Sequence, residues 1–393
     1  MNAAITPKAS YRLPGPASKK DWETMARLES AARTYPSHVH TTFVRAEGVY
    51  LFDADDNVYI DCLSGAGVMA LGHNHPVVVL AIRAALEAKV PIHMLDLVTP
   101  AKTRFVETLL GTFPDAFANR AKVHFCSPSG ADAVEAAIKL VKTATGRRSI
   151  IAFQGGYHGM THGALGVTGD VKAKAPVPNL MADVHFFPYP YSYRCPFGLG
   201  GDDGANVGIR YLQHSLDDPQ SGLASPAAVI VEAVQGEGGN IPAPTWWLAK
   251  LRAITAERGI PLILDEVQTG VGRTGMMYAF QHAGIIPDVV LVSKAVGAGL
   301  PLAVMLYHES LDSWVSGAHV GTFRANQLAM IAGTALLEFL HANDVVTHAR
   351  RMGPIERGAL DARVLRPPSP ARGEATRAMV DCQPASCVRR AHS

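Results

Sequence analysis

The chain has 393 residues, of which 48% are hydrophobic and 18% are charged, and its formal net charge is +2 at pH 7. This balance is typical of a globular protein of two or three domains, and it excludes a largely disordered chain. So small a net charge gives no reason to expect binding to nucleic acid or to an anionic membrane. No apolar run reaches the length of a membrane-spanning helix, and residues 1–20 do not resemble a signal peptide.

The five cysteines are widely spaced and show no pattern of metal ligands. Because their number is odd, intramolecular disulfides could not pair all of them. We therefore expect reduced thiols, no metal site and a cytoplasmic protein.

Residues 1–75 form an N-terminal segment of mixed character. It ends in two short apolar runs, residues 48–53 and 57–61, on either side of a turn rich in Asp and Asn. Two such runs around a turn predict a β-hairpin.

Residues 76–326 alternate between short apolar runs and helical segments. This pattern predicts a large α/β domain with a mostly parallel central sheet flanked by helices. The expected helices cover residues 76–89, 131–145 and 245–259, and Gly146 is expected to end the second. The expected strands cover residues 123–126, 149–153, 227–232, 261–265 and 289–293.

The chain changes character after this domain. Residues 327–352 are expected to form a connecting helix toward a small domain. Residues 353–393 contain many prolines and arginines and no periodic apolar pattern, so an irregular tail is expected there.

Two of the expected strands end beside ionisable side chains. Asp265 lies at the end of strand 261–265, and Lys294 follows strand 289–293. Ligands bind at the carboxyl ends of strands in open α/β sheets. A lysine buried there loses hydration, which lowers its pKa and suits it to form a Schiff base. Taken alone, helix capping or an ion pair for Asp265 and a structural role for Lys294 remain open.

Two loops after other strands carry small and aromatic residues. Ser129, Gly130 and Ala131 precede a helix, where backbone N–H groups can bind an anion, although plain capping explains them as well. Tyr157 stands among glycines, so its ring can lie against a flat ligand or belong to the core. An anion site, an aromatic ring, an acid and a lysine on one sheet together indicate a site for pyridoxal 5'-phosphate (PLP).

Ordered motifs run through residues 35–350. They are Leu71–Pro76, Ser129–Ala137, Tyr157–Gly159, Glu232–Gly239, Asp265–Gly270, Gly272–Gly275, Ser293–Lys294 and Gly321–Phe323. Together they resemble the class III (ω-amino acid) aminotransferases of PLP fold type I. The resemblance implies an aspartate aminotransferase-like fold, PLP as cofactor, and a homodimer that shares its active sites.

The resemblance also implies roles for single residues. Lys294 would hold the cofactor as a Schiff base and move a proton during the reaction, and Asp265 would pair with the pyridine nitrogen. Glu237 would be the substrate-site carboxylate that neutralises an arginine in one half-reaction. His158 is expected to be structural and Glu232 to orient its neighbours. The other expected contacts to the cofactor are Ser129, Gly130 and Ala131 at the phosphate, Tyr157, Val267 and Gln268 at the ring, and Thr322 from the neighbouring subunit.

Two stretches, residues 153–165 and 188–198, resemble the diaminobutyrate–2-oxoglutarate transaminases within this class. This implies reversible transfer of the terminal amine of L-2,4-diaminobutyrate to 2-oxoglutarate, giving L-aspartate 4-semialdehyde and L-glutamate. A Pro/Tyr-rich surface loop explains residues 188–198 equally well. An ornithine or GABA type of ω-amino acid aminotransferase remains an alternative, because a few pocket contacts decide between such substrates.

Residues 352–393 do not resemble the C-terminal domain of the family, and no residue there matches its substrate-binding arginine. The expectation is therefore a truncated or replaced small domain and impaired turnover. A PLP-binding remnant without turnover, and another PLP reaction such as that of an aminomutase or racemase, remain alternatives.

Overall fold

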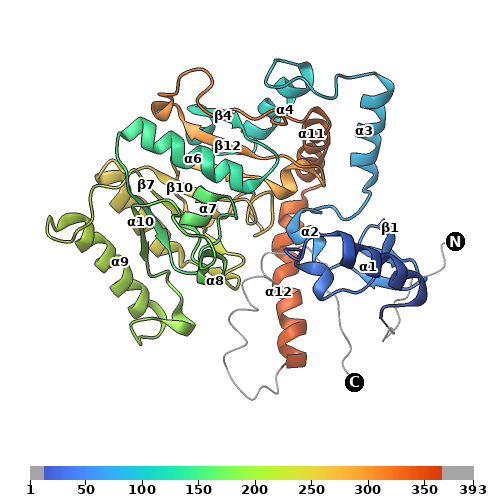
Figure 1. The fold of residues 1–393 in the computed structure, drawn as a ribbon. Coiled ribbons are helices and arrows are strands. Elements are labelled where there is room, and N and C mark those ends of the chain that lie inside the picture. Colours follow the sequence, from blue (N-terminus) through green and yellow to red (C-terminus); the bar gives the residue numbers. More distant parts are fainter. Residues whose placement is uncertain (1–12, 365–393) are drawn as a thin grey trace.

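The N-terminal part of the chain packs beside a larger domain in the computed structural model, which describes residues 13–364 (Figure 1). It starts with helix α1 (Pro16–Leu28) and continues into a small antiparallel sheet. The strands of this sheet are β1 (Phe43–Glu47), β2 (Tyr50–Asp53) and β3 (Val58–Ile60). Strands β2 and β3 confirm the predicted hairpin.

A seven-stranded sheet of order β4-β12-β11-β10-β7-β5-β6 forms the centre of the molecule. All neighbouring strands are parallel except β12, which is antiparallel to both β4 and β11. The predicted mostly parallel sheet is confirmed, whereas β6 and β12 had no counterpart in the prediction. The strands are β4 (Ala121–Phe125), β5 (Ile150–Phe153), β6 (Val184–Phe187), β7 (Ala228–Val231), β10 (Leu262–Asp265), β11 (Val289–Val292) and β12 (Val304–His308).

Helices cover both faces of the sheet (Figure 1). Successive strand residues point to opposite faces, so Ile150 and Ile263 pack on the α6 side, while Ile151 and Leu264 join the core under α4, α10 and α11. Burial on both faces explains why the strands read as continuous apolar runs. The longer helices are α3 (Pro76–Glu87), α4 (Pro100–Leu110), α6 (Gly130–Thr145), α9 (Gly201–Asp217), α10 (Thr245–Glu257), α11 (Gln327–Ala342) and α12 (Val345–Val364).

Short elements complete the connections between these strands and helices. They are the helices α2 (Ser64–Gly67), α5 (Asp115–Ala118), α7 (His162–Val167) and α8 (Val171–Lys174), and the paired strands β8 (Val234–Gln235) and β9 (Ile241–Pro242). Short 3-10 turns include η3 (Ala279–Ala283) and η4 (Lys294–Gly297). As predicted, Gly146 ends α6 in a left-handed conformation.

The C-terminal helix differs from the sequence prediction. The single connecting helix expected over residues 327–352 is two helices, α11 and α12, divided at Asn343 and Asp344. Helix α12 continues to Val364, so the irregular tail expected from residue 353 is wrong for residues 353–364. Pro354 lies inside this helix, where a proline removes one backbone hydrogen bond without always ending the helix. The rest of the predicted tail, residues 365–393, lies outside the described residues.

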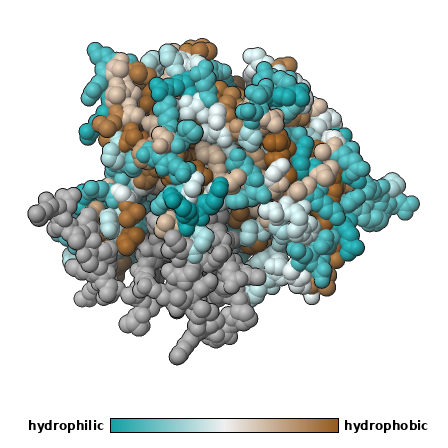
Figure 2. Space-filling view, turned by 180° about the vertical axis from the view of Figure 1, so that it is seen from behind, coloured by the Kyte–Doolittle hydropathy of each residue, from teal (hydrophilic) through white to brown (hydrophobic). Residues whose placement is uncertain are grey.

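On the face that Figure 2 shows, hydrophilic residues are interspersed with apolar patches. Among residues 13–364, no helix is both long and apolar enough to cross a bilayer.

Glu266, directly after β10, is buried and holds a neighbouring turn in place. Its carboxylate accepts hydrogen bonds from the Thr269 hydroxyl at 2.5 Å and from the backbone N–H groups of Ala279 and Phe280 at 3.0 and 2.9 Å. Burial nevertheless raises the pKa of Glu266 from 4.5 to about 7. The charged form is therefore disfavoured in the folded protein.

This raised pKa should make stability fall as pH rises. The folded state binds the Glu266 proton more tightly than the unfolded chain does, so the stabilisation is present below pH 4.5 and is lost as pH rises through about 7. The loss can reach about 3 kcal/mol for this group. Glu266→Gln should remove this part of the pH dependence in chemical denaturation at several pH values. Exposed Glu257→Gln is the control, and equal pH slopes for both variants would contradict the assignment.

Candidate active site

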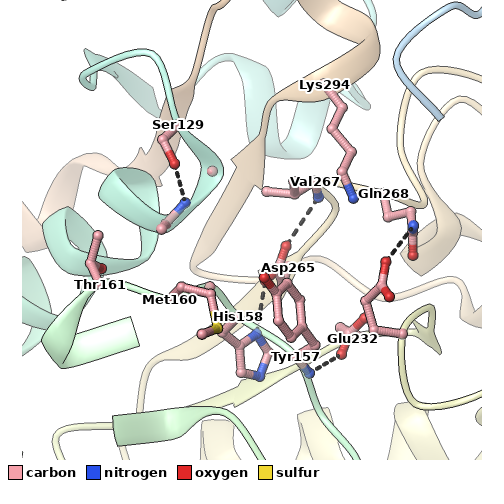
Figure 3. A pocket seen from close by; sticks show the side chains of 14 residues that line it. Ser129, Tyr157, His158, Met160, Thr161, Glu232, Asp265, Val267, Gln268 and Lys294 are labelled. Atoms are coloured by element: carbon pink, nitrogen blue, oxygen red, sulfur yellow. Dashed lines mark hydrogen bonds and ion pairs between the residues drawn. The ribbon is translucent and has the colours of Figure 1, made fainter. Parts of the chain in front are cut away.

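Loops at the carboxyl edge of the large sheet enclose a cavity of about 420 Å³, a size suited to a small ligand. Every candidate residue of the sequence analysis except Thr322 lines this cavity (Figure 3). Thr322 is exposed to solvent instead. The lining residues are Ser129, Gly130, Ala131, Tyr157, His158, Gly159, Met160, Thr161, Glu232, Glu237, Asp265, Val267, Gln268 and Lys294.

The sheet topology explains why these residues meet. Strands β5, β7, β10 and β11 are parallel and adjacent, so the loops that follow them emerge at the same edge. Tyr157 follows β5, Glu232 follows β7, Asp265 ends β10 and Lys294 follows β11. Residues far apart in the sequence thus share one cavity, as expected for the carboxyl ends of strands in an open α/β sheet.

A buried ion pair between His158 and Asp265 lies at the bottom of the cavity. His158 Nδ1 and Asp265 Oδ2 are 2.8 Å apart, and the two side chains are only 1% and 6% exposed. Burial alone would lower the pKa of His158, but the hydrogen bond and charge of Asp265 raise it. The other oxygen of Asp265 accepts the backbone N–H of Val267 at 3.1 Å. The carboxylate is therefore fixed in position by two hydrogen bonds.

Glu232 lies beside this pair and connects the loop after β5 with the segment after β8. Its carboxylate accepts the backbone N–H groups of Tyr157 at 2.9 Å and Gly236 at 3.0 Å. Burial raises the pKa of Glu232 to about 7. On the far side of this loop, the buried Tyr189 hydroxyl lies 3.0 Å from the Glu232 carbonyl oxygen, to which it donates. Tyr189 belongs to the Pro/Tyr-rich stretch 188–198, so part of this stretch supports the wall of the cavity.

Lys294 extends into the same space as Asp265 and Gln268 (Figure 3). Burial lowers the pKa of its amine, while the charges of Asp265, Glu237 and Glu232 raise it in part. A lowered pKa increases the fraction of neutral, nucleophilic amine. The backbone of Lys294 is left-handed, with φ of 50°. A long side chain in this conformation is strained, and such strain is typical of functional positions.

Ser129, Gly130 and Ala131 form a cradle at the N-terminus of α6. The Ser129 hydroxyl caps the helix by accepting the Ala131 N–H at 3.3 Å. A Cβ on Gly130 would lie 2.8 Å from Val267 Cγ1, so only glycine leaves both the loop and Val267 in place. The dipole of α6 favours an anion at this end of the helix.

A network of hydrogen bonds around Asp132 fixes the loop that precedes α6. Asp132 accepts the Ser127 N–H at 2.7 Å, and its Oδ2 atom lies 3.2 Å from His319 Nε2. Lys139 donates to His319 Nδ1 at 3.3 Å, so Nε2 carries the proton and donates to Asp132. Burial would raise the pKa of Asp132, but the hydrogen bonds from His319 and Ser127 lower it. A fixed, charged Asp132 therefore holds the start of the loop.

The sequence analysis did not assign several residues that this geometry brings in. Gly159, Met160 and Thr161 line the cavity, and Asp132 and His319 support it. Asp132 lies within the predicted cradle motif, so its position beside Ala131 was a usable signal. His319 is distant in sequence and could be assigned only from the fold.

The cavity offers the groups that PLP needs. A helix N-terminus suits the phosphate, a buried carboxylate suits a protonated ring nitrogen, and a half-buried lysine suits the aldehyde. The missing side chain at Gly130 leaves room beside Val267. The residues present therefore fit the cofactor.

The family model described as Aminotransferase class-III matches residues 31–365 of the chain. The chain belongs to the class III aminotransferases. The family confirms the resemblance inferred from the sequence, and it makes the protein a PLP-dependent transferase.

This aminotransferase is similar to curated bacterial proteins named diaminobutyrate–2-oxoglutarate aminotransferase. It is 55% identical to the protein of Rhizobium meliloti (strain 1021) over 327 residues, which are 83% of this chain and 70% of the relative. It is 49% identical to the protein of Haemophilus influenzae over 333 residues, which are 85% of this chain and 73% of the relative.

Solved structures confirm the PLP fold type I. A taurine:2-oxoglutarate aminotransferase from Bifidobacterium kashiwanohense, in complex with PLP and glutamate, superposes with a TM-score of 0.80 at 27% identity. The match covers 89% of this chain and 79% of that one. A PLP-bound amine transaminase from an uncultivated Pseudomonas species has a TM-score of 0.76 at 28% identity, covering 92% and 81% of the two chains.

The network around Asp132 generates a prediction about cofactor affinity. Asp132→Ala removes the carboxylate that accepts hydrogen bonds from the Ser127 N–H and from His319. The loop of the cradle should then be less ordered in the cofactor-free protein, and PLP binding would have to order it. We expect the Kd for PLP, measured by fluorescence titration, to rise about 10-fold. Asp115→Ala, which removes an exposed acid from the first turn of α5, is the matched control. Equal PLP affinity in the two variants would show that Asp132 does not position the cradle.

Proposed function

We propose that this aminotransferase transfers the terminal amine of L-2,4-diaminobutyrate to 2-oxoglutarate. The products are L-aspartate 4-semialdehyde and L-glutamate, and the reaction is reversible. The observation that carries the proposal is the convergence of Lys294, the His158–Asp265 pair and the α6 cradle in one cavity. The names and identities of the relatives support this choice of substrates.

Bound PLP supplies an aldehyde that condenses with amines and a ring that withdraws electrons from the neighbouring carbon. Asp265, held by His158, is placed to keep a proton on the pyridine nitrogen. Ser129, Gly130 and Ala131 would bind the phosphate at the N-terminus of α6.

The ring would lie between side chains on opposite loops. Val267 belongs to the loop after β10 and Tyr157 to the loop after β5, and both line the cavity. Gln268 would donate to the phenolic oxygen of the ring. Glu232 would act through the backbone of Tyr157, whose N–H it fixes.

Lys294 would hold the cofactor before the substrate arrives and would then move a proton. Its neutral amine would be the base that takes a proton from the substrate carbon next to the reacting nitrogen and later gives it back. The burial that lowers its pKa favours this neutral state.

The alternative donors differ from diaminobutyrate in small ways: ornithine has one more methylene group in its chain, and 4-aminobutyrate (GABA) lacks the α-ammonium group. The resemblances of residues 153–165 and 188–198, together with the two named relatives, favour diaminobutyrate. In the gate role known from the family, Glu237 would neutralise an arginine. A PLP-binding remnant without turnover would bind the cofactor without cycling it.

The visible absorption of the PLP-loaded protein tests the proposed function. L-2,4-diaminobutyrate should bleach the cofactor band, and 2-oxoglutarate should restore it. Lys294→Ala should slow this cycle about 100-fold or more, because it removes the proton-transferring amine. Lys174→Ala on α8 is the matched control. A band that forms but never cycles would support the remnant, and a cycle unchanged in Lys294→Ala would refute the role of Lys294.

We also propose a homodimer in which Thr322 binds the phosphate of the neighbouring subunit. Thr322 is exposed and does not line the cavity of its own subunit. Around it lies an apolar surface formed by residues 92–98 and 320–323. The His93 and Phe323 rings, 5.6 Å apart, join the two segments, as does an ion pair between Asp96 and Arg324. Contiguous exposed apolar surface of this kind marks an interface.

Substitution within this surface should prevent the dimer from forming. Val98 is 83% exposed and Phe323 is 68% exposed, so a charge at either position costs little in the isolated subunit. In an interface the charge would be buried without a partner. Val98→Asp should therefore sediment as a monomer and bind PLP more weakly. Val171→Asp, at a residue 74% exposed on α8, is the control, and a Val98→Asp dimer would contradict the proposal.

A cytoplasmic location is a further part of the proposal. Cys126 and Cys195 carry free thiols in the structure, as is usual for proteins of reducing compartments. Burial raises the pKa of the Cys126 thiol, so it stays protonated and unreactive.

A further inference from the structure

Among the described residues, Glu237 is the acid of the cavity with the weakest contact to the rest of the chain. Asp265 is paired with His158, and Glu232 accepts two backbone N–H groups. Glu237 is exposed, and its carboxylate accepts a long hydrogen bond of 3.5 Å from Gln268 Nε2. Its charge is therefore available to a ligand.

The negative charge of Glu237 reaches the reacting groups. It raises the pKa of Lys294 against the larger effect of burial, and it contributes, after burial, to the raised pKa of Tyr157. Glu237 thus lies close to where a substrate amine reacts. The nearby Arg273 guanidinium, whose charge also acts on Lys294, donates to the Gly67 carbonyl at 2.7 Å.

An exposed carboxylate at the end of a cavity attracts a cation of the ligand, and a charge-assisted hydrogen bond there adds specificity. L-2,4-diaminobutyrate carries such a cation, because its α-ammonium group lies at the end away from the reacting amine. 4-Aminobutyrate has the same carbon chain and carboxylate but lacks the α-ammonium group. The two donors therefore differ only in the group that Glu237 can recognise.

We propose that Glu237 determines donor specificity by binding the α-ammonium group of a diamino acid. This inference rests on the proposed function and names the group that is recognised. The oxo acid carries carboxylates and no ammonium group, so the contact contributes to the donor half-reaction alone. Gln268, which donates to Glu237, holds the carboxylate in the cavity.

The test compares the two donors in the PLP-loaded full chain. The rate constant for bleaching of the cofactor band is measured with L-2,4-diaminobutyrate and with 4-aminobutyrate for the wild type, Glu237→Gln and Glu237→Asp. Glu257→Gln, on the exposed end of α10, is the control. We expect Glu237→Gln to lower the preference for diaminobutyrate about 10-fold to 100-fold, the usual effect of losing a hydrogen bond to a charged group. Glu237→Asp should retain part of the preference.

The outcomes separate this inference from the proposed function. Equal slowing of both donors in Glu237→Gln would assign Glu237 a structural role and overturn the inference, while the cycle itself would still support the transaminase. Should neither donor bleach the band in the wild type, the proposed function fails.

In that case, calorimetric titration of the same proteins with both amines tests whether Glu237 binds the α-ammonium group. Tighter binding of diaminobutyrate that is lost in Glu237→Gln supports the inference, and equal binding overturns it.

Discussion

The buried pair of His158 and Asp265 is the interaction on which the rest of the site depends. A carboxylate that is only 6% exposed is costly to bury unless it has a partner, and His158 supplies one from a different loop. His158 follows β5 and Asp265 ends β10, and these two strands lie on either side of β7 in the sheet. Correct packing of all three strands is thus required to bring acid and imidazole together. Glu232, at the end of the middle strand, fixes the backbone of the residue before His158. The fold and the electrostatics of the site therefore stabilise each other.

Much of this arrangement follows from the sequence. Strands buried on both faces appear as apolar runs, so β5, β7, β10 and β11 and the residues at their ends could be located in advance. Because parallel strands end at one edge, the convergence of Tyr157, Asp265 and Lys294 could also be expected. The family resemblance added the assignment of individual roles, since an aspartate or a lysine after a strand is ambiguous by itself.

Other parts could not be found in the same way. Strand β12 follows the glycine-rich loop after Lys294 and runs antiparallel, so no alternation of strand and helix marks it. The pairing of Asp132 with His319 joins residues 187 positions apart, and nothing local to either residue indicates the other. The end of helix α12 could not be found because the residues from 353 onward are rich in proline and arginine and show no periodic apolar pattern. The apolar packing before Pro354, as at buried Ala349, keeps the helix in place through the proline.

The left-handed backbone of Lys294 has a consequence for how this site persists over evolutionary time. A lysine at φ of 50° costs the folded protein on the order of 1 kcal/mol, which a glycine at the same position would not. Stability alone would therefore favour replacement of the lysine by glycine, which relaxes the turn. Retention of the residue requires selection for its amine. A lysine kept in this strained turn therefore has a stability cost that a role for its amine would offset.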